Sequence, residues 1–140
     1  MLEGLQDSIR GGAILLMGLA VGAAWIMAIV APNCSYDRLD AGRADGHVRQ
    51  LLKSASDPIA FVLLAAGAMA ILGGALGAGI TSFLAAFGFF TNRWTLSSLK
   101  GKAPAGVKRR RKSQRVVAVS LTLMFTLVAA IAAVLAVFEV

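Results

Sequence analysis

The sequence predicts an all-α membrane protein with four transmembrane helices, of which the second and third form a tight hairpin. Of its 140 residues, 58% are hydrophobic and 15% are charged, whereas a soluble domain carries about 25% charged residues. The charges are also segregated, since the stretches 11–36, 58–92 and 116–138 carry none. Such stretches are transmembrane candidates, because ~20 helical residues cross a ~30 Å hydrocarbon core.

The first helix is expected over residues 11–31. Pro32 and Asn33 follow it directly, and proline disfavours continuation of a helix. The segment differs from a cleavable signal peptide, because the residues before it are acidic and its apolar stretch exceeds the usual ~7–15 residues. We therefore expect a helix of the mature protein, with Trp25 as an anchor at the membrane interface.

The second uncharged stretch, 58–92, is too long for one crossing. Its 35 residues would form a straight helix of about 50 Å. Residues 72–79 include four glycines, which turn the chain at low cost. This pattern predicts two short helices, 57–73 and 78–92. The alternative is one long tilted helix whose glycines pack against a neighbour.

The start of the second helix has two interpretations. Asp57 followed by Pro58 is typical of an N-cap and the first helical position, which places the start there. Alternatively, a helix begins near Ala41 and runs through with a kink at Pro58. The last helix is expected over 116–138, a stretch composed mostly of Val, Leu, Ala and Ile.

The basic residues predict the orientation, because cytoplasmic loops carry the excess of Lys and Arg. Segment 32–57 has four bases and segment 92–115 has nine, while Arg10 is the remaining one. Four helices put 13 bases on one side against 1, whereas three helices give 10 against 4. We therefore expect cytoplasmic loops over 32–56 and 93–115, with both termini in the periplasm of a bacterium and the chain in its inner membrane.

A short pattern follows the first helix: a proline, an aromatic residue, then Leu-x-Ala-Gly and a further glycine. The matching positions are Pro32, Tyr36, Leu39, Ala41, Gly42 and Gly46. In this pattern the chain resembles a bacterial family of small four-helix membrane proteins without assigned function, related to a human transmembrane protein linked to cisplatin resistance. It departs from that family just after the proline, where it has Asn33-Cys34-Ser35. The resemblance implies a four-helix architecture and no particular activity.

Several residue types that often have catalytic or metal-binding roles are expected to have structural roles in this sequence. One His and one Cys leave no metal-ligand set, so His47 is expected to be an interfacial polar residue and Cys34 a small residue packed at a helix end. The spacing of the aspartates does not make them converge, which favours solvated ion pairs with Arg38 or Arg43 as counter-ions. The aspartates concerned are Asp37, Asp40, Asp45 and Asp57. The methionines are expected to be packing residues, and these are Met17, Met27, Met69 and Met124.

Small residues at helical spacing are the first feature that points to a function. Such spacing lets helices approach closely in lipid, where packing drives association. The candidates for helix packing are Gly18, Gly22, Gly67, Gly73 and Gly77. They form either a tight internal bundle or a face for self-association or for a partner.

A basic run before the last helix is the second such feature. It consists of Lys108, Arg109, Arg110, Arg111 and Lys112. A cluster of this kind beside a helix end fixes topology and attracts anionic lipids, and docking to an acidic protein is the alternative. No aromatic residue is interleaved, which disfavours binding of single-stranded nucleic acid. Trp94 is the second expected interface anchor.

Apart from Asp57 at the very start of the second helix, the predicted spans hold no ionisable residue, which argues against a proton-coupled transporter, pump or channel. No nucleophile–base pair, phosphate loop or metal spacing is present, so we expect a non-enzyme without cofactors. The sequence favours an accessory or structural subunit that packs against a larger membrane complex. The alternative is a homo-oligomer that handles an apolar or cationic small molecule. A weaker third hypothesis is an organiser of anionic lipids that acts through residues 100–115.

Overall fold

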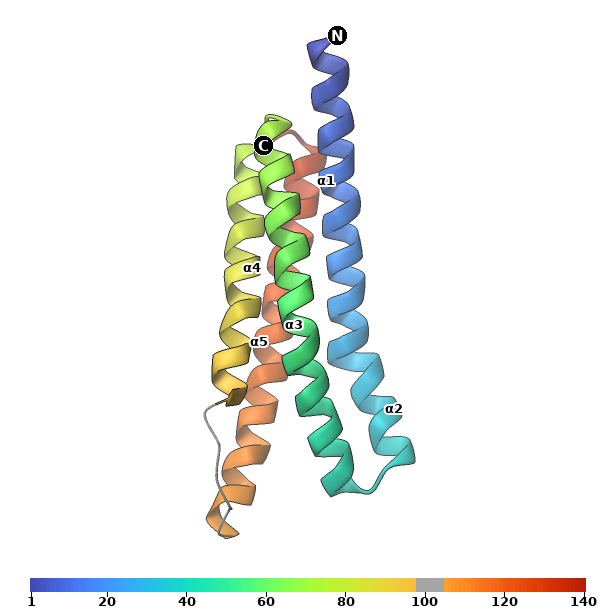
Figure 1. Ribbon diagram of the computed structural model, residues 1–140, viewed down its shortest axis with the longest axis vertical. Coiled ribbons are helices and arrows are strands. Elements are labelled where there is room, and N and C mark those ends of the chain that lie inside the picture. Colours follow the sequence, from blue (N-terminus) through green and yellow to red (C-terminus); the bar gives the residue numbers. More distant parts are fainter. Residues whose placement is uncertain (98–104) are drawn as a thin grey trace.

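In the part of the chain that the structure describes, the protein is an all-helical bundle of four long helical segments lying side by side (Figure 1). The computed structural model describes residues 1–97 and 105–140, and the side chains of 1–96 and 115–140. The first segment consists of α1 (Leu2–Trp25), the π-helical η1 (Ile26–Val30) and α2 (Ala31–Arg38). The other segments are α3 (Ala41–Leu72), α4 (Leu76–Ser97) and α5 (Ala105–Val137).

The expectation that Pro32 ends the first helix is wrong, since helical structure continues to Arg38. A proline inside a helix lacks an N–H donor, and its ring clashes with the carbonyl four residues earlier. Here that carbonyl belongs to Ala28, which lies in the π-helical turn Ile26–Val30. A π-helical turn bonds residues five apart, so this wider turn accommodates the proline. The segment ends only at Leu39, whose backbone is extended.

The expectation that α3 starts at Asp57 is also wrong, and the alternative start near Ala41 is confirmed. Asp40 is the N-cap residue, and its carbonyl accepts hydrogen bonds from the amides of Arg43 and Ala44, both at 2.9 Å. Pro58 lies inside the helix. The loop expected over 32–56 is therefore helical except for the link at Leu39 and Asp40.

The predicted hairpin is present, with α3 and α4 joined by a turn at residues 73–75. Gly74 has φ +87°. This conformation is unfavourable for any residue that has a side chain, whereas glycine adopts it at almost no cost in energy. The amide of Ala75 donates to the carbonyl of Ala70 at 2.9 Å, which closes the end of α3. The 58–92 stretch thus forms parts of two helices rather than one.

The last helix begins at Ala105, well before the expected residue 116. The loop expected over 93–115 is therefore helical at both ends, because α4 continues to Ser97. Its central part, residues 98–104, lies outside the described residues.

The four segments pack as a ring. The segment that contains α1 packs against α3 and α5, and α4 packs against the same two helices on the opposite side. The core is rich in alanine, with Phe89, Met17, Leu52 and Leu63 as its largest fully buried apolar side chains. Small side chains let helix backbones approach closely, and this kind of packing is typical of membrane bundles.

Within the described residues, three segments are long and apolar enough to cross a membrane: Leu2–Arg38, Ala41–Leu72 and Arg115–Val137. Only 33%, 39% and 28% of their most apolar windows are buried inside the bundle. Most of these apolar side chains therefore face outward, where a soluble protein would expose polar groups. The length and apolar composition of these three segments support a helical membrane protein.

Candidate functional site

Three of the predicted packing glycines lie inside the bundle. A Cβ atom on Gly67 would lie 2.9 Å from the ring of Phe83 and 3.1 Å from the carbonyl oxygen of Gly79. A Cβ atom on Gly73 would lie 3.0 Å from the Cβ of Arg10, and one on Gly77 would lie 3.0 Å from a backbone oxygen of Val140. These glycines therefore form close contacts within the chain itself.

The other two predicted glycines, Gly18 and Gly22, face outward. A Cβ atom added at either position would meet nothing within 4 Å. The surrounding side chains on this side of α1 are large and exposed. We call this surface the outer α1 face, and it consists of Gly18, Gly22, Leu15, Leu19 and Ile26. The bundle leaves this face without an intramolecular partner among the described residues.

Three further glycines that the sequence analysis did not single out are equally close to their neighbours. A side chain on Gly88 would overlap the ring of Phe125, and one on Gly79 would overlap Ile71. A Cβ atom on Gly12 would lie 2.7 Å from the side chain of Met69. The close packing of Gly79 could have been predicted from the sequence, because Gly79 lies in the same glycine-rich stretch as Gly77.

The two tryptophans lie at one level of the bundle. Arg10 lies next to Gly73, and α1 and α3 run in opposite directions (Figure 1). Trp25 and Asp57 are about 22 Å and 24 Å, respectively, from that contact along their helices, at 1.5 Å per residue. An ion pair of 2.9 Å joins Asp57 to Arg93, the residue before Trp94. Both indoles are more than half exposed, and their role as interface anchors stays a prediction.

A polar cluster ties α2, α3 and α5 together at the end of the bundle opposite the hairpin turn. Tyr36 donates a hydrogen bond to the carboxylate of Asp45, which also forms an ion pair with Arg115. The guanidinium of Arg115 lies 5.1 Å from the centre of the Tyr36 ring. Beside it, the hydroxyl of Ser35 lies 3.0 Å from Nδ1 of His47. The cluster thus joins residues that are up to 79 positions apart in the sequence.

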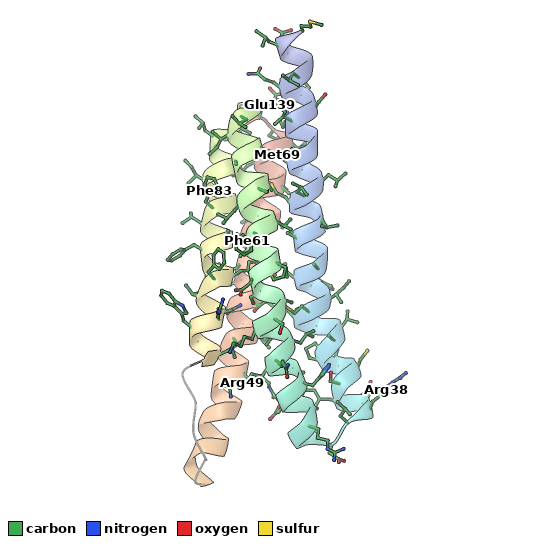
Figure 2. The ribbon with its side chains drawn as sticks, in the orientation of Figure 1. Arg38, Arg49, Phe61, Met69, Phe83 and Glu139 are labelled. Atoms are coloured by element: carbon green, nitrogen blue, oxygen red, sulfur yellow. The ribbon has the colours of Figure 1, made fainter. Side chains whose placement is uncertain are left out.

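These contacts correct the expected counter-ions of the aspartates. Asp45 pairs with Arg115 and Asp57 pairs with Arg93, rather than with Arg38 or Arg43. Arg38 lies at the far end of α2 (Figure 2). The expected pairing assumed short sequence distances, whereas the observed pairs join different helices.

A polar contact between α4 and α5 lies deeper in the bundle. Asn92 donates a hydrogen bond of 2.8 Å to the hydroxyl of Thr122, and both side chains are fully buried. Oδ1 of Asn92 and Oδ1 of Asp57 are buried without a hydrogen-bond partner within the described part of the chain.

On the hairpin side, Arg10 pairs with both Asp7 and Glu139 at 2.9 Å.

Among the side chains that the structure describes, the remaining candidates form no metal-ligating group. The expectation that Cys34 packs at a helix end is wrong, because Cys34 is exposed; it is in no disulfide. Over residues 1–96 and 115–140, His, Cys, Asp and Glu form no group of three that could hold a metal ion. Met17 and Met27 are buried, whereas Met124 is half exposed. The basic run 108–112 has a helical backbone within α5, but its side chains lie outside the described residues.

Comparisons with known proteins find no matching family model, no matching curated protein and no matching solved structure. The resemblance to the four-helix family therefore stays a prediction, and the case for function depends on the geometry of this chain.

Proposed function

We propose that the protein is an accessory or structural subunit that packs against a larger membrane complex through the outer α1 face. One observation carries the proposal: Gly18 and Gly22 lie on an exposed, apolar helix face and have open space above them. In lipid, helices associate through small residues that let their backbones approach closely.

The other glycines strengthen this argument by contrast. Gly67, Gly73 and Gly77 are each in contact with another part of the chain, so the intramolecular bundle accounts for them. Gly18 and Gly22 contribute nothing to that packing, and glycine costs a helix interior about 1 kcal/mol relative to alanine. A partner helix seated on the outer α1 face would account for the two residues.

The membrane arrangement that we propose has four crossings. In this arrangement α4 crosses together with α3, both termini are periplasmic, and the chain lies in a bacterial inner membrane. The distribution of basic residues supports this orientation. The basic run 108–112 would then lie on the cytoplasmic side, where it contacts anionic lipids or an acidic partner.

The test is a native purification with matched glycine variants. The tagged chain is extracted with a mild detergent, and co-purifying proteins are identified by mass spectrometry. We expect a stoichiometric membrane partner that is lost from Gly22→Leu. It should be retained by Gly42→Leu, because Gly42 on α3 is equally exposed and also has no neighbour within 4 Å.

Two outcomes would contradict the accessory role. A monomer that purifies alone would remove it. A homo-oligomer that Gly22→Leu dissociates would replace it with the alternative, a self-associating protein that handles an apolar or cationic small molecule.

A further inference from the structure

A continuous groove runs along the outside of the α3–α4 hairpin. Its apolar part, of about 430 Å³, is lined by Leu64, Ile80, Phe83, Leu84, Phe87 and Phe90. Phe87 and Phe90 also line a second hollow of about 430 Å³, which adds Thr91, Arg93 and Trp94. Because the two hollows share residues, we treat them as one surface and call it the α3–α4 groove.

The groove ends in a polar hollow. This hollow, of about 390 Å³, is lined by Gln50, Lys53, Ser54, Asp57 and Arg93. Arg93 therefore borders both the apolar groove and the polar hollow. Figure 2 shows Phe61 and Phe83 on the α3–α4 side of the bundle, away from α1. Phe61 packs edge-on against Phe90, with ring centres 5.4 Å apart, which fixes one wall of the groove.

The polar hollow is positively charged. It holds two cations, Lys53 and Arg93, and one carboxylate, Asp57. Asp57 binds Nη1 of Arg93 at 2.9 Å, but a guanidinium has five N–H donors and the Arg93 side chain is 58% exposed. Lys53 is exposed and forms no ion pair within the described part of the chain. Arg93 and Lys53 therefore both keep N–H donors that can bind an anion.

The dimensions match one leaflet of a bilayer. From Ile80 to Arg93 the groove extends along α4 for about 20 Å, at 1.5 Å per residue. Half of a ~30 Å hydrocarbon core is about 15 Å. An acyl chain that lies in the apolar part thus places its phosphate near Arg93. Trp94 borders the groove at that level, where tryptophan is enriched between acyl chains and head groups.

We propose that the α3–α4 groove binds one glycerophospholipid with an anionic head group. Its acyl chain lies along Phe83 and Phe87, and its phosphate contacts Lys53 and Arg93. The proposal rests on the α3–α4 hairpin lying in the membrane, which is part of the proposed function, but it is independent of any partner on the outer α1 face. Basic pockets between membrane helices are a common form of site for anionic lipids.

The experiment uses the two tryptophans as separate reporters in the full chain. Trp25 and Trp94 are its only tryptophans, so Trp25→Phe leaves a reporter in the groove and Trp94→Phe leaves one on α1. Each variant is reconstituted into bilayers of mixed phosphatidylcholine and phosphatidylglycerol, in which one of the two lipids carries brominated acyl chains. Brominated chains quench tryptophan fluorescence on contact.

We expect brominated phosphatidylglycerol to quench Trp94 more than brominated phosphatidylcholine at equal mole fraction, with an apparent preference of roughly two- to five-fold. Lys53→Gln should reduce this preference to near unity, whereas Arg38→Gln on the far end of α2 should not. Trp25 should show little preference, which controls for general attraction of anionic lipids to the net charge of +7.

The other outcomes separate a failure of the lipid site from a failure of the four-helix arrangement. Equal quenching of Trp94 by the two lipids, or a preference that Lys53→Gln leaves unchanged, would overturn the lipid site while leaving the hairpin in the membrane. Absence of quenching of Trp94 by either lipid would contradict the membrane position of α4, and with it the four-helix arrangement under the proposed function.

Discussion

Asn92 on α4 donates a hydrogen bond of 2.8 Å to Thr122 on α5, and both side chains are fully buried. The same Thr122 hydroxyl donates to the carbonyl of Ala118 at 2.7 Å, so it bonds within its own helix and across the interface. Hydrogen bonds between membrane helices contribute about 0.6–1.7 kcal/mol. This pair therefore fixes the register of α4 against α5.

The first prediction concerns this pair. Thr122→Val keeps the side-chain shape, removes the acceptor and leaves the buried Asn92 amide without a partner. We expect a loss of about 1–2 kcal/mol in the free energy of unfolding, measured by titration from mild detergent into sodium dodecyl sulfate. Thr126→Val is the matched control, because buried Thr126 bonds only to the carbonyl of Thr122 on its own helix. Equal losses for the two variants would contradict a special role for the interhelical bond.

The second prediction separates the two classes of glycine. Gly88→Ala places a methyl group against the ring of Phe125, and overpacking of this kind costs about 1–3 kcal/mol. Gly22→Ala adds a methyl group in open space and should stabilise the isolated chain by about 0.5–1 kcal/mol, because alanine favours a helix more than glycine does. Unfolding titrations of both variants check the signs. A destabilised Gly22→Ala chain would show that this face is already occupied within the bundle.

The third prediction concerns the cluster of Tyr36, Asp45 and Arg115. Arg115→Gln removes both the ion pair with Asp45 and the contact with the Tyr36 ring. Partly exposed contacts of these types contribute about 0.5–1 kcal/mol each, so we expect a loss of about 1 kcal/mol. The double variant with Asp45→Asn should lose less than the sum of the two single variants. Additive losses would mean that the pair contributes no coupling energy.

The fourth prediction tests the orientation. Cys34 is the only cysteine and is exposed, so a membrane-impermeant maleimide reports its side without background. With both termini periplasmic, Cys34 should react in inside-out vesicles and not in right-side-out spheroplasts. A chain with Cys34→Ser and Glu139→Cys should show the reverse pattern. Labelling of both positions from the same side would contradict the four-crossing topology.

The uncharged stretches and the glycine-rich turn were sufficient to predict four helices and the hairpin. The hydrophobic signal is local, because each membrane-facing helix must be apolar along its own length. Gly73 and Gly74 likewise specify a turn locally, and Gly74 adopts the positive φ that favours glycine. The number of helices and the position of the hairpin turn therefore follow from adjacent residues.

Helix ends and polar contacts were harder to predict. Pro32 ends a helix in the usual case, but a π-helical turn before it lets the helix continue. Asp57 followed by Pro58 has the sequence of a helix start, but Asp57 lies inside α3, and its carboxylate binds Arg93, which lies 36 residues further along the chain. The packing of α3 against α4 brings such partners together, and a local sequence pattern carries no information about that packing. The outward position of Gly18 and Gly22 also depends on which side of α1 the bundle covers.

The ring order of the helices separates the two proposed binding surfaces. α1 and α4 lie on opposite sides of the ring, each packed between α3 and α5. A protein seated on the outer α1 face would therefore leave the hairpin side in contact with the bilayer. Occupancy of one surface does not compete with occupancy of the other, so a chain of 140 residues has room to hold a protein neighbour and a lipid simultaneously.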